Sequence, residues 1–180
     1  CAQRPTAACA FPQREGESIK WPLLHRDSTR ANRFAVNECF AIDARNRSPL
    51  GNRGANGIDG LLSTALGAAA SSGAPTALLL GDLSFLHDVG ALQLAARHRL
   101  PLLIVVVDND GGGIFQLLPC AELGETFERC FLTPHGLDLL DAAKLGGFDT
   151  ARVAGEGDLA SAVADWSARP RGMLVEVACD

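Results

Sequence analysis

Two apolar segments, Thr76–Leu80 and Leu102–Val107, constrain the fold of this chain more than any other feature. Each is followed at once by acidic or amide side chains and glycine: Gly81-Asp82-Leu83-Ser84 after the first, and residues 108–113 after the second. Continuous apolar runs of this length are typical of parallel strands, and the segment between them is long enough for a crossover helix. Because the carboxyl ends of neighbouring parallel strands meet at one edge of a sheet, the sequence predicts a ligand site there.

The remaining pattern extends this unit to a doubly wound α/β fold, a parallel sheet with helices on both faces. Helix-like and strand-like segments alternate from residue 61 onward, with a polar connection expected at Glu122–Arg129. We expect helices at Leu61–Ser71, Phe85–Arg97, Leu137–Leu145 and Asp158–Ala168, and strands at Thr76–Leu80, Leu102–Val107, Phe148–Val153 and Met173–Val177.

The first 50 residues differ in character from the rest of the chain. They hold four prolines, and eight Lys and Arg against five Asp and Glu, whereas the remaining residues hold eight against sixteen. We interpret residues 1–50 as a linker or the remnant of a preceding domain, and residues 51–180 as the ligand-binding domain. The interspersed acids argue against a nucleic-acid-binding arm, and no apolar run is long enough to span a membrane.

The first residue and the spacing of the cysteines indicate how the chain arises and in which compartment it lies. Because the chain starts at Cys1 rather than at methionine, we expect a fragment or a processed piece. The six cysteines show no Cys-x-x-Cys pairing, which favours reduced thiols in an intracellular compartment.

The two polar segments supply the donors that a hard cation requires. Mg²⁺ prefers oxygen ligands, and Asp82, Asn109 and Gly111 offer a carboxylate, an amide oxygen and a backbone carbonyl. The helix after Asp82 and the glycine-rich turn after Asn109 would offer N–H groups to phosphate oxygens, while the Ser84 hydroxyl either binds phosphate or caps the helix. Asp, Asn and Gly also form ordinary turns, so either segment alone favours a turn; their joint placement favours a site.

These residues resemble a known family. Gly81-Asp82 followed by Asn109 resembles the signature of thiamine-diphosphate enzymes, in which Gly-Asp-Gly precedes Asn-Asn by about one βαβ unit. A more specific resemblance is to the 2-succinyl-5-enolpyruvyl-6-hydroxy-3-cyclohexene-1-carboxylate (SEPHCHC) synthase family of menaquinone and phylloquinone biosynthesis. The segments that carry it are residues 52–60, 81–84 and 112–119. It runs from about Gly51 to Asp180, with Thr133-Pro134-His135-Gly136 as a weaker point. Asp108 and Asp110 depart from the pattern, because asparagines are more usual beside Asn109.

The resemblance implies a transferase that uses thiamine diphosphate with Mg²⁺ (or Mn²⁺). It would decarboxylate 2-oxoglutarate and add the resulting succinyl-semialdehyde carbanion to isochorismate, with this chain supplying the diphosphate- and metal-binding part. Metal ligands would be Asp82, Asn109 and Gly111. The implied cofactor-binding residues are Gly57, Ile58, Gly81, Asp82, Leu83, Ser84, Asn109, Gly111 and Gly112.

The resemblance also implies a substrate pocket. Arg53 would bind substrate carboxylates through its guanidinium group, since that fork matches a carboxylate with two hydrogen bonds. Ile114, Phe115 and Leu118 would wall the pocket and exclude water. From the residues alone, a solvated surface position stays open for Arg53 as the less favoured alternative, whereas Ile58, Ile114 and Phe115 are equally compatible with core packing.

Further parts of the enzyme are implied to lie elsewhere. In this family a glutamate on a separate pyrimidine-binding domain promotes the proton transfers of the cofactor, and it acts across a dimer interface. We therefore expect a missing domain or second subunit, and a homo-oligomer such as a homodimer. The enzyme would be cytoplasmic in a bacterium and plastid-located in a plant or alga.

Two other interpretations stay open at this point, and a third is disfavoured. The chain could belong to another thiamine-diphosphate 2-oxoacid decarboxylase or an acetolactate-type enzyme. It could be a non-catalytic remnant, an interpretation to which Asp108 and Asp110 point. A Rossmann or P-loop nucleotide binder is disfavoured, because no Gly-x-Gly-x-x-Gly follows a strand and no Gly-Lys-Ser/Thr occurs.

Overall fold

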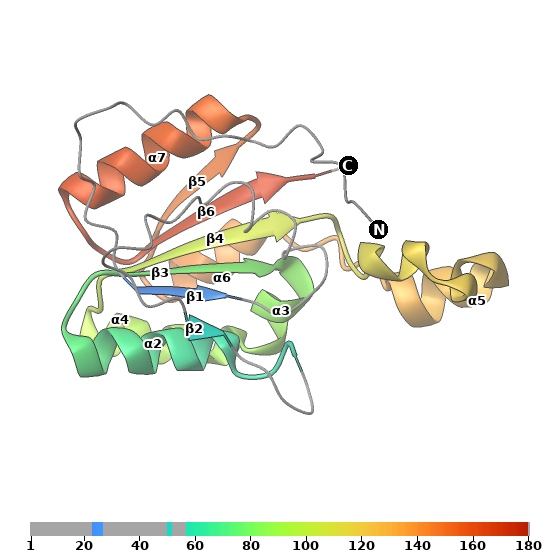
Figure 1. The fold of residues 1–180 in the computed structure, drawn as a ribbon, viewed down its shortest axis with the longest axis horizontal. Helices are drawn as coiled ribbons and strands as arrows, with labels where there is room; N and C mark the ends of the chain where they lie inside the picture. Colours follow the sequence, from blue (N-terminus) through green and yellow to red (C-terminus); the bar gives the residue numbers. More distant parts are fainter. Residues whose placement is uncertain (1–22, 27–49, 52–56, 180) are drawn as a thin grey trace, which may run out of the picture.

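One parallel sheet forms the centre of the computed structural model, which describes residues 23–26, 50–51 and 57–179. The sheet has six strands in the order β2-β1-β3-β4-β6-β5, and its neighbouring strands all pair in parallel (Figure 1). The strands are β1 Leu23–Arg26, β2 Leu50–Gly51, β3 Thr76–Gly81, β4 Leu102–Asp108, β5 Asp149–Val153 and β6 Met173–Ala178.

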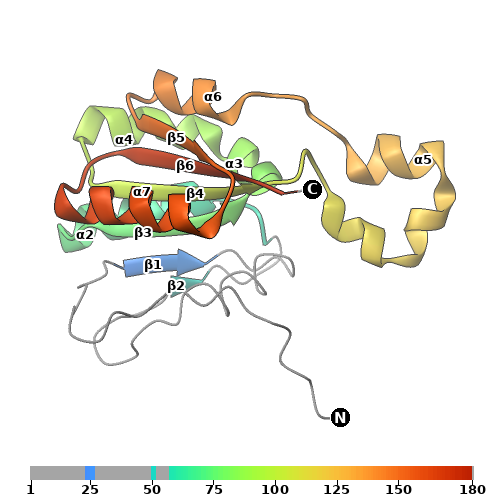
Figure 2. The ribbon, with the colours of Figure 1, turned by 90° about the horizontal axis from the view of Figure 1, so that it is seen from above.

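Helices cover both faces of this sheet, which confirms the predicted fold class. Along β3, Leu78 and Leu80 pack against one group of helices, whereas Ala77 and Leu79 lie in the core on the opposite face. The helices of the first face are α2 Leu61–Ser72, α3 Asp82–His87, α4 Leu92–His98 and α6 Leu139–Leu145. Helix α7, Glu156–Ala168, packs on the other face through the fully buried Trp166 (Figure 2). The central strands are therefore buried on both sides, as their continuous apolar sequence requires.

The predicted helix at Phe85–Arg97 is wrong as a single element. Helix α3 ends at His87, a 3-10 helix η1 spans Val89–Ala91, and α4 begins at Leu92. The interruption lies at Asp88, the residue after α3. Its carboxylate accepts hydrogen bonds from the backbone N–H (2.6 Å) and the hydroxyl (2.9 Å) of Ser63 in α2. Asp88 thereby satisfies an open N–H group in the first turn of α2, a tertiary contact that outweighs local helix propensity.

Strand β1 comes from the part of the chain interpreted as linker or remnant. Its residues pair with β3 from Leu23↔Thr76 to Arg26↔Leu79, and with β2 at the other edge. Residues 23–26 therefore belong to the sheet. This strand is hard to predict from sequence, because it is short and ends in His25 and Arg26. The division of the chain at residue 51 remains a prediction.

An arm of short helical turns projects beyond the carboxyl edge of the sheet (Figures 1 and 2). The arm (residues 113–132) consists of η2 Gly113–Leu117, η3 Pro119–Leu123, α5 Glu125–Phe127 and the π-helical turn η4 Glu128–Leu132. The polar connection predicted at Glu122–Arg129 is exposed except at Phe127, and it contains helical turns that the sequence analysis did not predict. Phe127 is buried and stacks on Phe131 with 6.0 Å between ring centroids, so aromatic contacts order this segment.

The remaining elements follow the prediction to within two residues. Helix α6 begins after Asp138, whose carboxylate accepts a hydrogen bond from the Leu140 N–H (3.0 Å) as an N-cap. Asp158 lies in the first turn of α7, where an acidic side chain favours the positive end of the helix dipole. Within the part of the chain that the structure describes, each helix is too short or too polar to cross a bilayer.

Candidate metal and cofactor site

The carboxyl ends of β3 and β4 lie side by side and bring the two polar segments together. Gly81 pairs with Val107, so Asp82, the first residue of α3, meets the turn that follows β4. The Asp82 carboxylate is buried. Its Oδ1 accepts the Leu83 N–H (2.7 Å), and its Oδ2 accepts the N–H groups of Gly111 (2.7 Å) and Asn109 (3.3 Å). The turn after β4 therefore wraps around this carboxylate, as the strand arrangement predicted.

The side-chain amide of Asn109 completes a group of oxygen donors. One of its two terminal atoms lies 2.6 Å from the Gly111 carbonyl oxygen and 3.3 Å from Asp82 Oδ2. With nitrogen at that position the amide donates to both neighbours; with oxygen there, three oxygens converge and repel one another unless a cation lies between them. A carboxylate, an amide oxygen and a backbone carbonyl are ligands that suit Mg²⁺. The residues present therefore fit the expected cation.

Glycine is required in this turn by the close approach of the arm. A Cβ on Gly111 would lie 2.2 Å from the Leu132 carbonyl oxygen, and one on Gly112 would lie 2.2 Å from that of Phe131. The Gly111 φ of 135° also lies in a region that side chains disfavour. The Gly112 N–H donates to the Leu132 oxygen (2.6 Å), so both glycine N–H groups are engaged within the protein. The role of this turn in binding phosphate stays a prediction.

Asp108 and Asp110 have structural partners. Asp108 Oδ1 accepts the Asp110 N–H (2.9 Å), and burial raises the pKa of Asp108, with the neighbouring Asp82 carboxylate acting in the same direction. Asp110 Oδ1 accepts the backbone N–H groups of His135 (3.0 Å) and Gly136 (2.7 Å). Asp110 therefore anchors the turn at residues 133–136 to the site, a contact that the sequence could not reveal.

His135 is the site residue that sequence reasoning missed. Its side chain is 9% exposed, and Nε2 lies 3.4 Å from Asp82 Oδ2 and 3.7 Å from Asp108 Oδ1. These three side chains are close enough to suggest a metal site of their own. However, Nδ1 accepts the Leu137 N–H (3.0 Å), so the neutral ring carries its proton on Nε2 and donates there. A histidine that ligates a metal through Nε2 instead donates from its other nitrogen. His135 is therefore a donor to Asp82 rather than a ready ligand.

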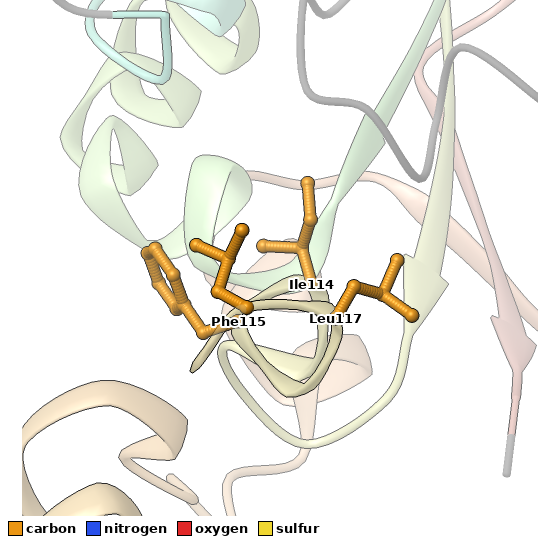
Figure 3. Close-up of a pocket in the computed structure, with 4 residues that line it drawn as sticks. Ile114, Phe115 and Leu117 are labelled. Carbon is orange, nitrogen blue, oxygen red and sulfur yellow. The ribbon is translucent and has the colours of Figure 1, made fainter. Parts of the chain in front are cut away.

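An apolar hollow of about 200 Å³ lies at the base of the arm (Figure 3). Ile114, Phe115 and Leu118, the predicted pocket wall, line it together with Leu117, which the sequence analysis did not single out. Phe115 is 36% exposed and Leu118 45%, so they are not core residues. The Phe115 ring packs edge-on against Phe131, with 5.9 Å between ring centroids. This contact joins the hollow to η4, the last turn of the arm.

The other predicted site residues are distributed around this edge of the sheet. Gly57 and Ile58 lie in the turn before α2 and are half-buried, whereas Ser84 is buried in α3. Leu83 follows Asp82 in the same helix. Arg53 lies outside the described residues. The functional roles of all these residues remain predictions.

The fold and the donor set together define a class of protein, the diphosphate-binding domains of thiamine-dependent enzymes. A family model described as "Thiamine pyrophosphate enzyme, C-terminal TPP binding domain" matches residues 34–177. The chain belongs to this family. The match begins within the first 50 residues, so the similarity extends further toward the amino terminus than residue 51, where the sequence analysis placed its start.

Curated relatives named 2-succinyl-5-enolpyruvyl-6-hydroxy-3-cyclohexene-1-carboxylate synthase are similar to this chain, which confirms the resemblance. The protein from Myxococcus xanthus is 60% identical over 100 residues, 54% of this chain and 17% of the relative. The protein from Chlorobaculum parvum is 40% identical over 183 residues, 96% of this chain and 31% of the relative. The chain thus spans less than a third of either relative.

Solved structures support the fold. A benzoylformate decarboxylase from Polynucleobacter necessarius superposes with a TM-score of 0.70 at 22% identity, over 88% of this chain and 30% of the other. A thiamine diphosphate-dependent 4-hydroxybenzoylformate decarboxylase from Rhodococcus jostii gives 0.63 at 23% identity, over 89% and 30%. At such identity the likeness supports the fold alone.

Proposed function

We propose that this chain is the diphosphate- and metal-binding part of a SEPHCHC synthase, a thiamine-diphosphate-dependent transferase of menaquinone or phylloquinone biosynthesis. The observation that carries the proposal is the convergence of the Asp82 carboxylate, the Asn109 amide and the Gly111 carbonyl at the carboxyl edge of the sheet. The names of the relatives and the family match support the same assignment.

Asp82, Asn109 and Gly111 would hold Mg²⁺ or Mn²⁺, and the cation would hold the diphosphate. The start of α3, with Leu83 and Ser84, directly follows Asp82 and is the proposed phosphate side of the site. The N–H groups of Leu83, Gly111 and Gly112 all have protein acceptors. When bound, thiamine diphosphate supplies the carbon nucleophile that allows a 2-oxoacid to lose CO₂ and its acyl group to be transferred. The protein contributes binding, orientation and exclusion of water.

The hollow at the base of the arm is the proposed substrate side of the site. Ile114, Phe115 and Leu118 offer apolar walls, which would exclude water from the reacting groups and strengthen the charge interactions of bound carboxylates. Arg53 is proposed to bind a carboxylate of 2-oxoglutarate or isochorismate. The reaction would join the four carbons left from 2-oxoglutarate to isochorismate and give 2-succinyl-5-enolpyruvyl-6-hydroxy-3-cyclohexene-1-carboxylate.

The complete enzyme would need parts beyond this chain. Since the chain spans 17% to 31% of the two relatives described above, the pyrimidine-binding domain and its glutamate are proposed to come from the rest of the polypeptide or a second subunit. Exposed apolar side chains on the arm, Leu117 at 74% and Leu123 at 52%, are compatible with such a partner. We expect the isolated chain to bind the cofactor weakly; submicromolar affinity in a stable monomer would contradict this.

Calorimetric titration with thiamine diphosphate, with and without Mg²⁺, tests the cofactor assignment. We expect binding that requires Mg²⁺ and that Asp82→Ala abolishes. Asp141→Ala is the matched control, because Asp141 is an exposed helical aspartate whose carboxylate contacts only Lys144 (2.8 Å) among the contacts described. Binding that is independent of Mg²⁺, or equal in Asp82→Ala and Asp141→Ala, would refute the proposed site.

The reaction is tested separately. The chain is joined to the pyrimidine-binding part of a relative and supplied with 2-oxoglutarate, with or without isochorismate, and the products are identified by mass spectrometry. Product formation that requires both substrates supports the synthase. Release of succinic semialdehyde alone, unchanged by isochorismate, would instead indicate a 2-oxoacid decarboxylase.

A further inference from the structure

His135 is fixed against the metal-site carboxylate by contacts on three sides. Asp110 Oδ1 accepts the backbone N–H groups of His135 and Gly136, which holds the turn at residues 133–136. The Leu137 N–H donates to Nδ1 (3.0 Å), which places the proton of the neutral ring on Nε2. Nε2 then lies 3.4 Å from Asp82 Oδ2. The ring thus presents a donor to one particular oxygen.

That oxygen is also the one that the cation would use. Asp82 Oδ2 is the carboxylate atom next to the Asn109 amide, so an ion shared with Asn109 and Gly111 would lie against it. Oδ2 already accepts the Gly111 N–H and the Asn109 N–H. A carboxylate oxygen has too few lone pairs for three donors and a cation together. The His135 contact is the one expected to be lost, because at 3.4 Å it is the longest of the three.

We propose that His135 donates a hydrogen bond to the buried Asp82 carboxylate only while the cation site is empty, and that a bound cation displaces this hydrogen bond. This inference rests on the proposed function, since it assumes a cation at Asp82, Asn109 and Gly111. Each further hydrogen bond to a buried carboxylate stabilises it, so His135 adds stability to the cation-free chain beyond that from the three backbone N–H donors of Asp82. By linkage, whatever stabilises only the cation-free form weakens cation affinity.

The test compares Mn²⁺ binding to the wild-type chain, His135→Ala and His135→Gln, followed by electron paramagnetic resonance of the free ion. Loss of one hydrogen bond to the carboxylate is expected to lower the Mn²⁺ Kd of His135→Ala by about two- to tenfold. His135→Gln keeps an N–H donor at the same reach and should restore the wild-type Kd. His87→Ala is the control, because His87 is exposed and pairs with Asp59 (3.0 Å).

Thermal unfolding separates this role from a merely structural one. Without Mn²⁺ we expect His135→Ala to unfold at a lower temperature than the wild type, and with saturating Mn²⁺ we expect the two midpoints to converge. An equal loss in both conditions, or a Kd for His135→Ala that is unchanged or higher, would overturn the inference while leaving the cation site intact. Failure of the wild-type chain to bind Mn²⁺ would refute the cation site and this inference together.

Discussion

Replacing Gly112 with alanine tests whether the arm depends on the glycine turn. The new Cβ would lie 2.2 Å from the Phe131 carbonyl oxygen and 2.8 Å from Phe115 Cδ2. Ordinary contact therefore requires a backbone shift of about 1 Å, and that shift would weaken the adjacent Gly112 N–H to Leu132 oxygen bond of 2.6 Å. The Gly112 φ of −82° is negative, so alanine would not be forced into a left-handed backbone.

The magnitude follows from three contributions. Overpacking costs about 1–3 kcal/mol, and the weakened hydrogen bond about 1 kcal/mol. Alanine lowers the entropy of the unfolded chain and offsets about 0.4–1 kcal/mol of this. We expect Gly112→Ala to reduce the free energy of unfolding by about 1–3.5 kcal/mol.

Urea denaturation, monitored by circular dichroism, measures this change through the midpoint and the m value. Gly90→Ala is the matched control: Gly90 lies in a 3-10 helix, and a Cβ there would meet no atom within 4 Å. Equal stability of Gly112→Ala and Gly90→Ala would refute the close packing of the arm on the turn.

Three further predictions concern other parts of the molecule. Arg152→Ala removes both hydrogen bonds (2.6 and 3.2 Å) to the buried Glu176 carboxylate, so the urea midpoint should fall; adding Glu176→Leu should restore part of the loss. A hydrogen bond from Arg171 lowers the pKa of Asp165, so this pair stabilises the fold above the unfolded pKa and stops doing so as the pH falls through the folded pKa. The difference in Tm between wild type and Asp165→Asn should therefore be present at about pH 7 and shrink below about pH 4. Leu117 is 74% exposed on the arm, and Leu117→Ser should reduce self-association measured by sedimentation velocity.

The central strands were predictable because their environment is simple. β3 and β4 are buried on both faces, so every position favours an apolar residue, and the predicted bounds differ from those observed by one residue at the carboxyl end. Helix α2 was predictable for a local reason: Gly73 takes a left-handed conformation, and its N–H donates to the Ala69 oxygen (3.0 Å). Here the local sequence and the tertiary fold agree.

Elements that depend on distant contacts were not predictable. The break after His87 reflects the use of Asp88 to cap a helix 25 residues earlier. The turns of the arm depend on Phe131 contacting both Phe127 and Phe115. Neither arrangement leaves a periodic pattern in the sequence, because each is fixed by single pairs of residues rather than by a repeating face.

The candidate site also combines a part that was predictable from the sequence with a part that was not. The proximity of Asp82 to Asn109 and Gly111 was predictable, because these residues follow two neighbouring parallel strands. In the structure, Asp82 accepts hydrogen bonds from both backbone N–H groups. The contact between His135 and Asp82 spans 53 positions and depends on Asp110 holding an irregular turn. In the sequence, Asp110 read only as additional negative charge.

At the carboxyl edge of the sheet, the proposed cation ligands and the apolar hollow come from two different segments of the chain. The proposed cation ligands all come from one continuous stretch, residues 82–111, which is a single crossover unit with its following turn. The apolar hollow is formed by the arm, which enters and leaves at the same edge and packs on the turn through glycines. An exchange or insertion within the arm can therefore reshape the surface offered to an organic molecule while the cation-binding unit keeps its geometry. Such a division lets one scaffold diversify its substrates by changing about twenty residues of protruding chain.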